Sequence, residues 1–385
     1  MRVGLRALAV AVAAVTASVA LSTAGAAPAG ATERTAGTAG VQVVHRYFGP
    51  MPTGVTVSRH GRIFSNFPRW IDQVPATVTE IRGGREVPYP NAAINQLDTA
   101  HAATHFISVQ SVVVDQADRL WALDTGRINF GPMIPGGAKL VGIDLRTNQV
   151  VKSIPFPPDV ALSTTELNDV RFDLRRGRAG MAFITDSSAN GPNAIIVVDL
   201  ATGQSWRRLN DHPTVKAEPN FTPIIEGQPW LVRPPDAPPS SLTEGVDGIA
   251  ISPDGRTLFY CALSSRTLYS VSVDALADRG TPDSAVAATV RNLGRKGMSD
   301  GLETDRRDRV YGGDIERNAL IRRLPDGRIQ TVVQGSRIIW IDTLSMGADG
   351  FMYFTVNQLN RLPRFHEDKD LRVKPYVLYR VRIDH

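Results

Sequence analysis

Acidic and amide side chains recur at one position of a repeated sequence pattern. In each copy a polar residue stands just before an alternating apolar stretch, which predicts a short, half-buried strand. Asp247-Gly-Ile-Ala-Ile-Ser252 is an example. Six copies align on this position, and their polar residues, called here the polar column, are Thr53, Gln110, Asn168, Asp247, Asp300 and Asp342.

The chemistry of the polar column depends on what offsets its negative charge. Three of its residues are carboxylates, and carboxylates held close together repel one another. A Ca²⁺ ion would suit such a column because it takes several oxygen ligands. A protonated amine would suit it equally, above all with aromatic faces nearby. The column therefore predicts a site for a positively charged group and leaves both kinds open.

The elements around the column predict the fold. Most copies continue into a polar or glycine turn and then a second apolar strand, as at Leu120-Trp-Ala-Leu123. The copies lie roughly 40 to 80 residues apart, a spacing typical of propeller blades. A ring of four-stranded blades buries both faces of each blade and removes exposed edges. We therefore predict an all-β, six-bladed β-propeller.

In such a ring the inner strands start around one mouth of the central channel, so the polar column should surround that mouth. The second strands end at the same mouth, and their ends are also polar, as at Asp124-Thr125. Some of these side chains are expected to line a pocket, while others bond neighbouring backbone amides.

The last copy supplies one strand too few for a complete blade. Its strands are expected at 342–347, 350–356 and Tyr376 to Arg382, while Val41 to Val44 forms an isolated strand ahead of the first copy. We predict that this N-terminal strand completes the last blade and closes a propeller that extends over residues 41–385.

The N-terminus reads as a targeting segment. Residues 1–31 combine Arg2 and Arg6 with a short apolar run and small residues that fit a cleavage site, which is typical of a signal peptide. Residues 32–40 are expected to be a flexible linker. The mature chain is thus predicted to be secreted, with no stable membrane association after cleavage. Its single cysteine, Cys261, lies in an apolar stretch and is expected to be a buried hydrophobe.

Composition and missing motifs exclude several classes of function. The chain has 43 Lys and Arg against 38 Asp and Glu, a formal net charge of +5. Its arginine clusters fall in predicted turns without interleaved aromatic residues, so nucleic acid is not an expected partner. There is no Gly-x-Ser-x-Gly elbow, no glycine-rich phosphate loop and no Cys-x-x-Cys, so covalent hydrolysis and nucleotide chemistry are not supported.

A proline-rich insert separates the third and fourth copies, at about residues 210–243. Its composition excludes a helix and favours an ordered loop or lid. Because it joins the end of one blade to the inner strand of the next, we expect it to cover the mouth that carries the column. Phe221 or Trp230 should then come within reach of the pocket.

Several motifs, in order along residues 43–383, resemble the major royal jelly protein / yellow family. They include Phe67-Pro-Arg-Trp70 and Arg119-Leu-Trp-Ala-Leu-Asp-Thr-Gly126, and the closest match is Asn360-Arg-Leu-Pro-Arg-Phe365. The resemblance implies a secreted six-bladed propeller with a small-molecule pocket at one end of its channel. Relatives in that family are linked to dopachrome conversion and to binding of biogenic amines. The lone cysteine departs from the disulfide-bonded insect members.

A second, weaker likeness is to the gluconolactonase / senescence marker protein family. Asn168, Asp247 and Asp300 resemble the strand starts from which that family holds a divalent metal. That family also uses a glutamate from the first blade, and the aligned residue here is Thr53.

These observations favour a propeller that binds a small aromatic or amine-bearing molecule and requires no cofactor, although Ca²⁺ stays open as one. Whether it is an enzyme is left open between a dopachrome-type tautomerase, a calcium-dependent lactonase and a non-catalytic scaffold. Asp247 and Asp300 are the candidate proton-transfer residues. The same two residues with Asn168 would hold the metal in a lactonase. The candidate ligand-binding residues are Asn168, Asp342, Gln110, Arg69, Trp70, Asp124, Arg364 and Trp230.

Overall fold

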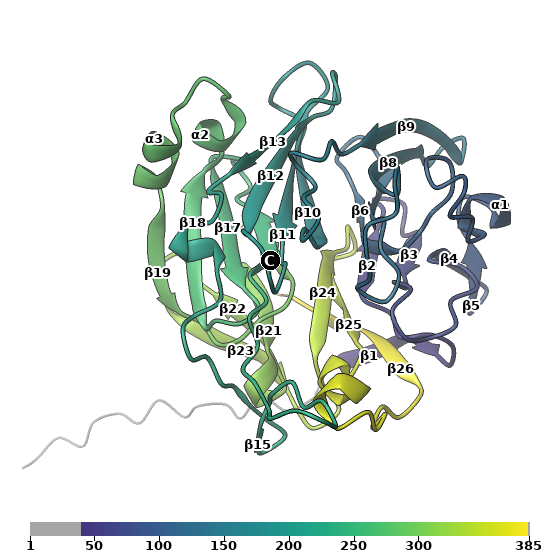
Figure 1. Ribbon diagram of the computed structural model, residues 1–385, viewed down its shortest axis with the longest axis vertical. Coiled ribbons are helices and arrows are strands. Elements are labelled where there is room, and N and C mark those ends of the chain that lie inside the picture. The colour runs from purple at the N-terminus through teal and green to yellow at the C-terminus, as the bar shows by residue number, and fades with distance from the viewer. Residues whose placement is uncertain (1–39, 384–385) are drawn as a thin grey trace, which may run out of the picture. The chain divides into compact units, whose positions relative to one another are not determined.

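The computed structural model describes residues 40–383. Within this range the chain forms six four-stranded antiparallel sheets arranged as blades around one centre (Figure 1). The expected six-bladed β-propeller is therefore confirmed. The predicted signal peptide and almost all of the linker at 32–40 lie outside the described residues.

The first three blades follow one another along the chain, each running from its inner to its outer strand. Blade 1 consists of β2 (Gly54–Val57), β3 (Ile63–Asn66), β4 (Val78–Arg82) and β5 (Arg85–Pro88). Blade 2 consists of β6 (Val109–Val114), β7 (Arg119–Thr125), β8 (Ala138–Asp144) and β9 (Gln149–Pro155). Blade 3 consists of β10 (Leu167–Asp173), β11 (Met181–Asp186), β12 (Ala194–Asp199) and β13 (Ser205–Arg208).

The last three blades repeat this order, and the sixth takes its outer strand from the N-terminus. Blade 4 consists of β16 (Val246–Ile251), β17 (Thr257–Ala262), β18 (Thr267–Ser272) and β19 (Arg291–Arg295). Blade 5 consists of β20 (Leu302–Thr304), β21 (Val310–Asp314), β22 (Ala319–Arg323) and β23 (Ile329–Gln334). Blade 6 consists of β24 (Ile341–Met346), β25 (Phe351–Val356), β26 (Tyr376–Arg382) and β1 (Val41–Tyr47).

The helices among the described residues are short and lie between strands. They are α1 (Ala92–Asn95), α2 (Val273–Ala277), α3 (Asp283–Ala288) and the 3₁₀ turns η1 (Pro213–Val215), η2 (Ile315–Arg317), η3 (Leu359–Arg361) and η4 (Pro363–Phe365). A two-stranded hairpin, β14 (Ile224–Ile225) with β15 (Gln228–Pro229), belongs to the proline-rich insert. None of the helices within residues 40–383 is long and apolar enough to cross a membrane.

The ring is closed by its two ends. β1 pairs antiparallel with β26, from Val41 opposite Val381 to Tyr47 opposite Tyr376. In Figure 1 the purple β1 lies beside the yellow β26. This pairing confirms the expected closure by the N-terminal strand, and it removes the free edge that an incomplete last blade would expose.

Apolar side chains between neighbouring blades hold the ring together. Trp121 of β7 stacks on Phe172 of β10, with ring centroids 5.2 Å apart, and donates its indole N–H to Asp115 at 2.8 Å. Cys261 is fully buried in β17, as its apolar surroundings predict.

Hydrogen bonds at the channel mouth connect neighbouring blades. Thr185 Oγ1 of blade 3 donates to the carbonyl oxygen of Asp247 at 2.8 Å, and Thr355 Oγ1 of blade 6 donates to that of Thr53 at 2.8 Å. The backbone N–H of Gly301 donates to the carbonyl of Asp342 at 2.8 Å. The polar column is thus fixed through its backbone.

Glycines after the column allow this close approach. A Cβ on Gly248 would lie 2.2 Å from the carbonyl oxygen of Asp300, and one on Gly301 would lie 2.5 Å from that of Asp342. Both distances are far inside van der Waals contact with backbone, which cannot give way easily. The Asp-Gly pattern in the sequence therefore reflects the crowding of inner strands around the channel.

We expect Gly301→Ala to lower the free energy of unfolding by about 1–3 kcal/mol, because the new methyl group forces two inner strands apart. Urea denaturation measures this. Gly49→Ala is the matched control, since a Cβ there meets nothing within 4 Å, and it should change stability by less than about 0.5 kcal/mol. Equal effects at both glycines would contradict the crowding argument.

Candidate functional site

A cavity of about 350 Å³ opens at the mouth where the inner strands begin. Five of the six column residues line it, one from each of blades 2 to 6. Its lining consists of Trp70, Gln110, Arg127, Phe130, Ser163, Thr164, Glu166, Asn168, Ser187, Ser188, Ala189, Asn190, Glu244, Asp247, Leu263, Asp300, Asp342, Leu359, Leu362 and Arg364.

Thr53, the sixth column residue, is fully buried and does not line the cavity. Its hydroxyl donates to the carbonyl of Gln110 at 3.2 Å and accepts from the amide of Asn66 at 2.8 Å. At this position the column ties two blades together instead of facing a ligand.

Three carboxyls form one half of the cavity floor, called here the carboxyl arc: Asp247, Asp300 and Asp342, which are 4%, 7% and 5% exposed. Burial raises the pKa of Asp247 well above its usual value, and the neighbouring Asp300 raises it further. Burial also raises the pKa of Asp342, again with a contribution from Asp300. Desolvation and mutual repulsion thus both favour protonated forms.

Asp300 is the most readily ionised member of the arc. Burial raises its pKa to about 6, while hydrogen bonds from Asp247 and from the indole of Trp340 oppose that rise. Trp340 Nε1 donates to Asp300 Oδ2 at 2.7 Å. Of this hydrogen-bonded pair, Asp300 therefore ionises before Asp247 as the pH rises.

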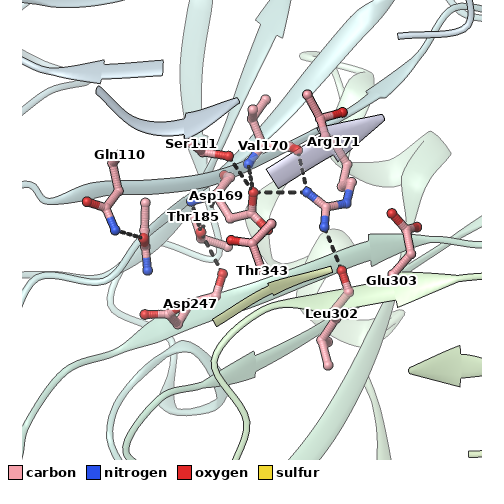
Figure 2. Close-up of polar contacts among 12 residues, drawn as sticks. Gln110, Ser111, Asp169, Val170, Arg171, Thr185, Asp247, Leu302, Glu303 and Thr343 are labelled. Atoms are coloured by element: carbon pink, nitrogen blue, oxygen red, sulfur yellow. Dashed lines mark hydrogen bonds and ion pairs between the residues drawn. The ribbon is translucent and has the colours of Figure 1, made fainter. Parts of the chain in front are cut away.

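Two amides form the other half of the floor, called here the amide pair. Gln110 Nε2 donates to Asn168 Oδ1 at 3.0 Å, and both residues are 9% exposed. Gln110 Oε1 is buried and has no hydrogen-bond partner. In Figure 2, Gln110 and Asp247 lie on the same side of the residues drawn as sticks.

Aromatic rings and an arginine form the wall above the floor. Trp70 stacks on Phe130 with centroids 4.9 Å apart and planes 27° apart. The Arg364 guanidinium lies over Phe130, 5.4 Å from its centroid, and donates to Glu244 Oε1 at 2.9 Å. The wall thus offers an aromatic face whose neighbouring arginine is already paired with a carboxylate.

A second arginine, Arg127, lies at the rim. It donates to backbone carbonyls of Gly131, Ser163 and Thr165, and its Nε is 3.7 Å from Glu166 Oε2. Burial raises the pKa of Glu166 to about 7 in spite of this arginine.

A buried ionic cluster links the inner strands of blades 3 and 5 (Figure 2). Arg171 donates to Asp169 Oδ1 at 2.9 Å and crosses to blade 5, where it donates to the carbonyl of Leu302 at 2.6 Å. Burial raises the pKa of Glu303 beside it, and Arg171 opposes that rise. The guanidinium is therefore bound to other partners, and within residues 40–383 no ion pair joins a cation to the carboxyl arc.

Seven of the ten predicted catalytic or ligand-binding residues line the cavity: Gln110, Asn168, Asp247, Asp300, Asp342, Trp70 and Arg364. The structure brings them together from five blades and their connecting loops. What each does toward a ligand stays a prediction.

The other three residues are elsewhere, so their predicted place at the pocket is wrong. Arg69 is buried and donates to the carbonyls of Asn95, Phe106 and Ile107, which locks blade 1 to blade 2. Asp124 is fully buried, accepts from the N–H groups of Ile107 and Ser108, and pairs with Lys139. Both side chains therefore bond to backbone groups, and Asp124 also to an oppositely charged side chain, instead of facing the cavity.

Trp230 is buried one layer behind the cavity. Its ring packs against Trp340 and Phe365, with centroids 4.7 and 4.4 Å away. Phe221 is also buried outside the lining, and no residue of the insert between 210 and 243 lines the cavity. The insert therefore supports the mouth from behind, and the expectation that its aromatic residues face the pocket is wrong.

The sequence reading missed Arg127, Phe130, Glu166 and Glu244. Glu166 and Glu244 stand two and three residues ahead of column members, on the stretch that enters the inner strand from the mouth. Arg127 and Phe130 follow the end of a second strand. A search of the residues that flank strand ends on the mouth side would have found all four.

The donors present are a poor set for a divalent metal. The Asn168 oxygen accepts a hydrogen bond from Gln110, and Asp247 and Asp300 are bonded to each other. Among residues 40–383 no three His, Cys, Asp or Glu side chains are grouped so as to hold a metal ion. Thr53 also supplies no carboxylate.

Fold and site define a class: a six-bladed propeller with an acidic, partly aromatic cavity at the mouth of its channel. Residues 107–381 match the family described as Major royal jelly protein. The chain belongs to this family.

Individual relatives agree with this assignment. The chain is 28% identical to Major royal jelly protein 1 of Apis mellifera over 230 residues, which are 56% of this chain and 48% of the relative. It is 27% identical to Protein yellow of Drosophila melanogaster over 235 residues, 56% of this chain and 40% of the relative. The matched stretch thus spans about half the length of these relatives or less.

Solved structures share the fold at low sequence identity. A gluconolactonase from Xanthomonas campestris superposes with a TM-score of 0.53 and 12% identity, covering 89% of each chain. A luciferin-regenerating enzyme gives 0.52 and 11%, covering 89% of this chain and 95% of the other. At this identity the likeness shows the fold alone.

Asp300→Asn should raise the free energy of unfolding at pH 8, by about 1–3 kcal/mol. The pKa of Asp300 in the folded protein is about 6, which is above the pKa of an unfolded aspartate. The wild type therefore loses stability as the pH rises from the unfolded pKa to the folded one. The amide has no charge to bury.

Urea unfolding at pH 4.5, 6 and 8 measures this difference, which should shrink toward acid. The control Asp159→Asn changes an exposed carboxylate and should show no such trend. A stability difference that is independent of pH would contradict the argument.

Proposed function

We propose that this chain is an exported propeller that binds a small aromatic ammonium compound in the mouth cavity. The observation that carries the proposal is the carboxyl arc, which faces the same cavity as Trp70 and Phe130 and forms no ion pair with any cation in the described part of the chain. The export part rests on the N-terminal targeting pattern alone.

Binding would use the arc and the wall together. The ammonium group would replace the repulsion within the arc by attraction, and the aromatic ring would stack beside Trp70 and Phe130. Since Asp300 ionises with a pKa of about 6, affinity should rise as pH increases from 5 to 7. The cation in turn favours further ionisation of Asp247 and Asp342.

Proton transfer of the dopachrome-conversion type is a natural extension. The ionised Asp300 could accept a proton from one ligand carbon while the protonated Asp247 returns one to another atom, which leaves atoms and charge balanced. The names of the related yellow and royal jelly proteins describe no such reaction. The proton-transfer proposal therefore rests on the hydrogen-bonded carboxyl pair of Asp247 and Asp300.

Calorimetric titration of chelator-treated protein with 2-phenylethylamine tests the binding proposal. We expect measurable binding that strengthens between pH 5 and 7 and weakens about 10- to 100-fold in Asp300→Asn, because the charge-assisted contact to the ionised carboxylate is lost. The neutral analogue 2-phenylethanol should bind far more weakly, and Asp159→Asn is the matched control. Equal affinity for the amine and the alcohol would overturn the proposal.

The calcium-dependent lactonase is tested in the same sample. Calcium titration with a lactone hydrolysis assay should show neither tight binding nor turnover, because the Asn168 oxygen and the carboxyl pair are already engaged. Tight calcium binding lost in Asp247→Asn, together with calcium-dependent hydrolysis, would replace the amine proposal by the lactonase.

A further inference from the structure

We propose that the end of the propeller opposite the mouth cavity binds a compound with two or more linked phosphate groups. The site consists of two adjoining hollows, called here the arginine hollows, on turns that follow the inner and outer strands of blade 5 and its neighbours. It shares no residue with the mouth cavity, so this inference does not depend on the proposed function.

The larger arginine hollow, of about 640 Å³, lies where the inner strands of blades 1, 2, 5 and 6 end. Its lining consists of Val57, Arg59, Gln116, Asp305, Arg306, Arg307, Arg309, Met346, Gly347, Ala348, Gly350 and Ile383. The smaller one, of about 500 Å³, is lined by Arg307, Arg309, Arg322, Leu324, Pro325, Asp326, Arg328 and Gln330 of blade 5. The two hollows share two arginines and therefore adjoin.

Positive charge dominates the lining of both hollows. Together they are lined by six arginines and two aspartates, with no lysine, histidine or glutamate. The mouth cavity has the opposite balance, with five acidic side chains and two arginines in its lining. A concave surface lined by one sign of charge concentrates the electrostatic potential and attracts counter-ions. The arginine hollows should therefore attract anions.

The turn between β20 and β21 is held together by Asp305. The Asp305 carboxylate accepts bonds from the backbone N–H groups of Arg307 and Arg309, at 2.9 and 3.1 Å. It also accepts from Arg309 Nε at 2.5 Å and from the Tyr311 hydroxyl at 2.9 Å. This carboxylate is thus committed to the turn and to Arg309, and it has no side-chain contact with the two arginines at the tip.

Blade 2 builds the same turn without arginines at its tip. Asp115 accepts two backbone N–H groups of its turn and the indole N–H of the following strand, in the same arrangement. Gln116 and Ala117 stand where blade 5 has Arg306 and Arg307. Because the fold forms this turn with neutral residues, the two arginines of blade 5 point to a role outside folding.

The side chains of Arg306 and Arg307 are available to a ligand. Both residues are exposed, and within residues 40–383 neither side chain has a hydrogen bond or an ion pair. A guanidinium group presents its N–H donors in a rigid, planar fork that matches the oxygens of a phosphate group. These two side chains are therefore the expected direct contacts to the anion.

The other arginines are held in place and add positive charge around this pair. Arg322 Nε donates to Gln330 Oε1 at 2.8 Å, and Arg328 Nε donates to Asp326 Oδ2 at 2.7 Å. Arg59 Nε lies 3.6 Å from the Asp118 carboxylate.

The shape and lining of the hollows favour linked phosphate groups. A single phosphate group fills only part of one hollow, whereas a short phosphate chain can extend past the shared arginines into both. No aromatic side chain lines either hollow, so the bases of a nucleic acid would have no ring on which to stack. A phosphate chain without bases fits the site better.

Calorimetric titration with orthophosphate and tripolyphosphate tests this, in metal-free buffer of low ionic strength. Tripolyphosphate should bind about tenfold more tightly, because it reaches both hollows. In Arg306→Gln/Arg307→Ala, which copies the blade 2 turn, its affinity should fall about five- to twentyfold, while the thermal unfolding temperature stays unchanged.

The matched control is Arg85→Gln/Arg178→Ala, which removes two exposed arginines that line neither hollow. Its affinity for tripolyphosphate should stay within about twofold of the wild type. Equal losses in the two double variants would show attraction by overall charge alone and would overturn the inference. Equal affinities for orthophosphate and tripolyphosphate would overturn it as well.

Two further probes separate the sources of phosphate: neutral-lipid vesicles containing phosphatidic acid, and a single-stranded DNA tetramer. Both should bind more weakly than tripolyphosphate. If vesicles bind through Arg306 and Arg307 while tripolyphosphate does not, the site belongs to a lipid headgroup and the soluble ligand is wrong. If the DNA binds more tightly than tripolyphosphate, the site belongs to nucleic acid and the inference is again wrong.

Discussion

The hydrogen bonds between blades at the channel mouth are the contacts on which the site depends. The backbone carbonyls of Gln110, Asp247, Asp342 and Thr53 each accept a bond from the preceding blade. Because these bonds fix the backbone, the side chains of the column do not have to hold the ring together. Five blades can therefore place a costly carboxyl or amide in the cavity without losing their packing.

The carboxyl arc shows what that freedom allows. Buried acids without cationic partners destabilise the ligand-free protein, and such strain concentrates at functional sites. The buried guanidinium of Arg171 does not relieve it, since Arg171 is bonded to Asp169 and to the Leu302 carbonyl.

The fold and the residues of the cavity floor were predictable because both follow from short sequence patterns. The polar residue before each inner strand repeats with the strand, so a one-dimensional alignment already placed Asp247 beside Asp300. The wall was not predictable in this way. Arg364 meets Glu244, and Trp230 meets Trp340, across more than 100 residues of chain. Only the course of the loops decides which of them face the cavity.

The proline-rich insert acts on the site through such a loop contact. Its Trp230 packs on Trp340, whose backbone lies in the left-handed region at φ 61°, a conformation that costs a bulky residue about 1–3 kcal/mol. That conformation brings the Trp340 indole to Asp300, where its N–H opposes the rise in pKa caused by burial. Loosening the insert would free Trp340 to relax and would leave Asp300 less easily ionised. The insert is therefore connected to the Asp300 carboxyl through Trp340, from behind the cavity.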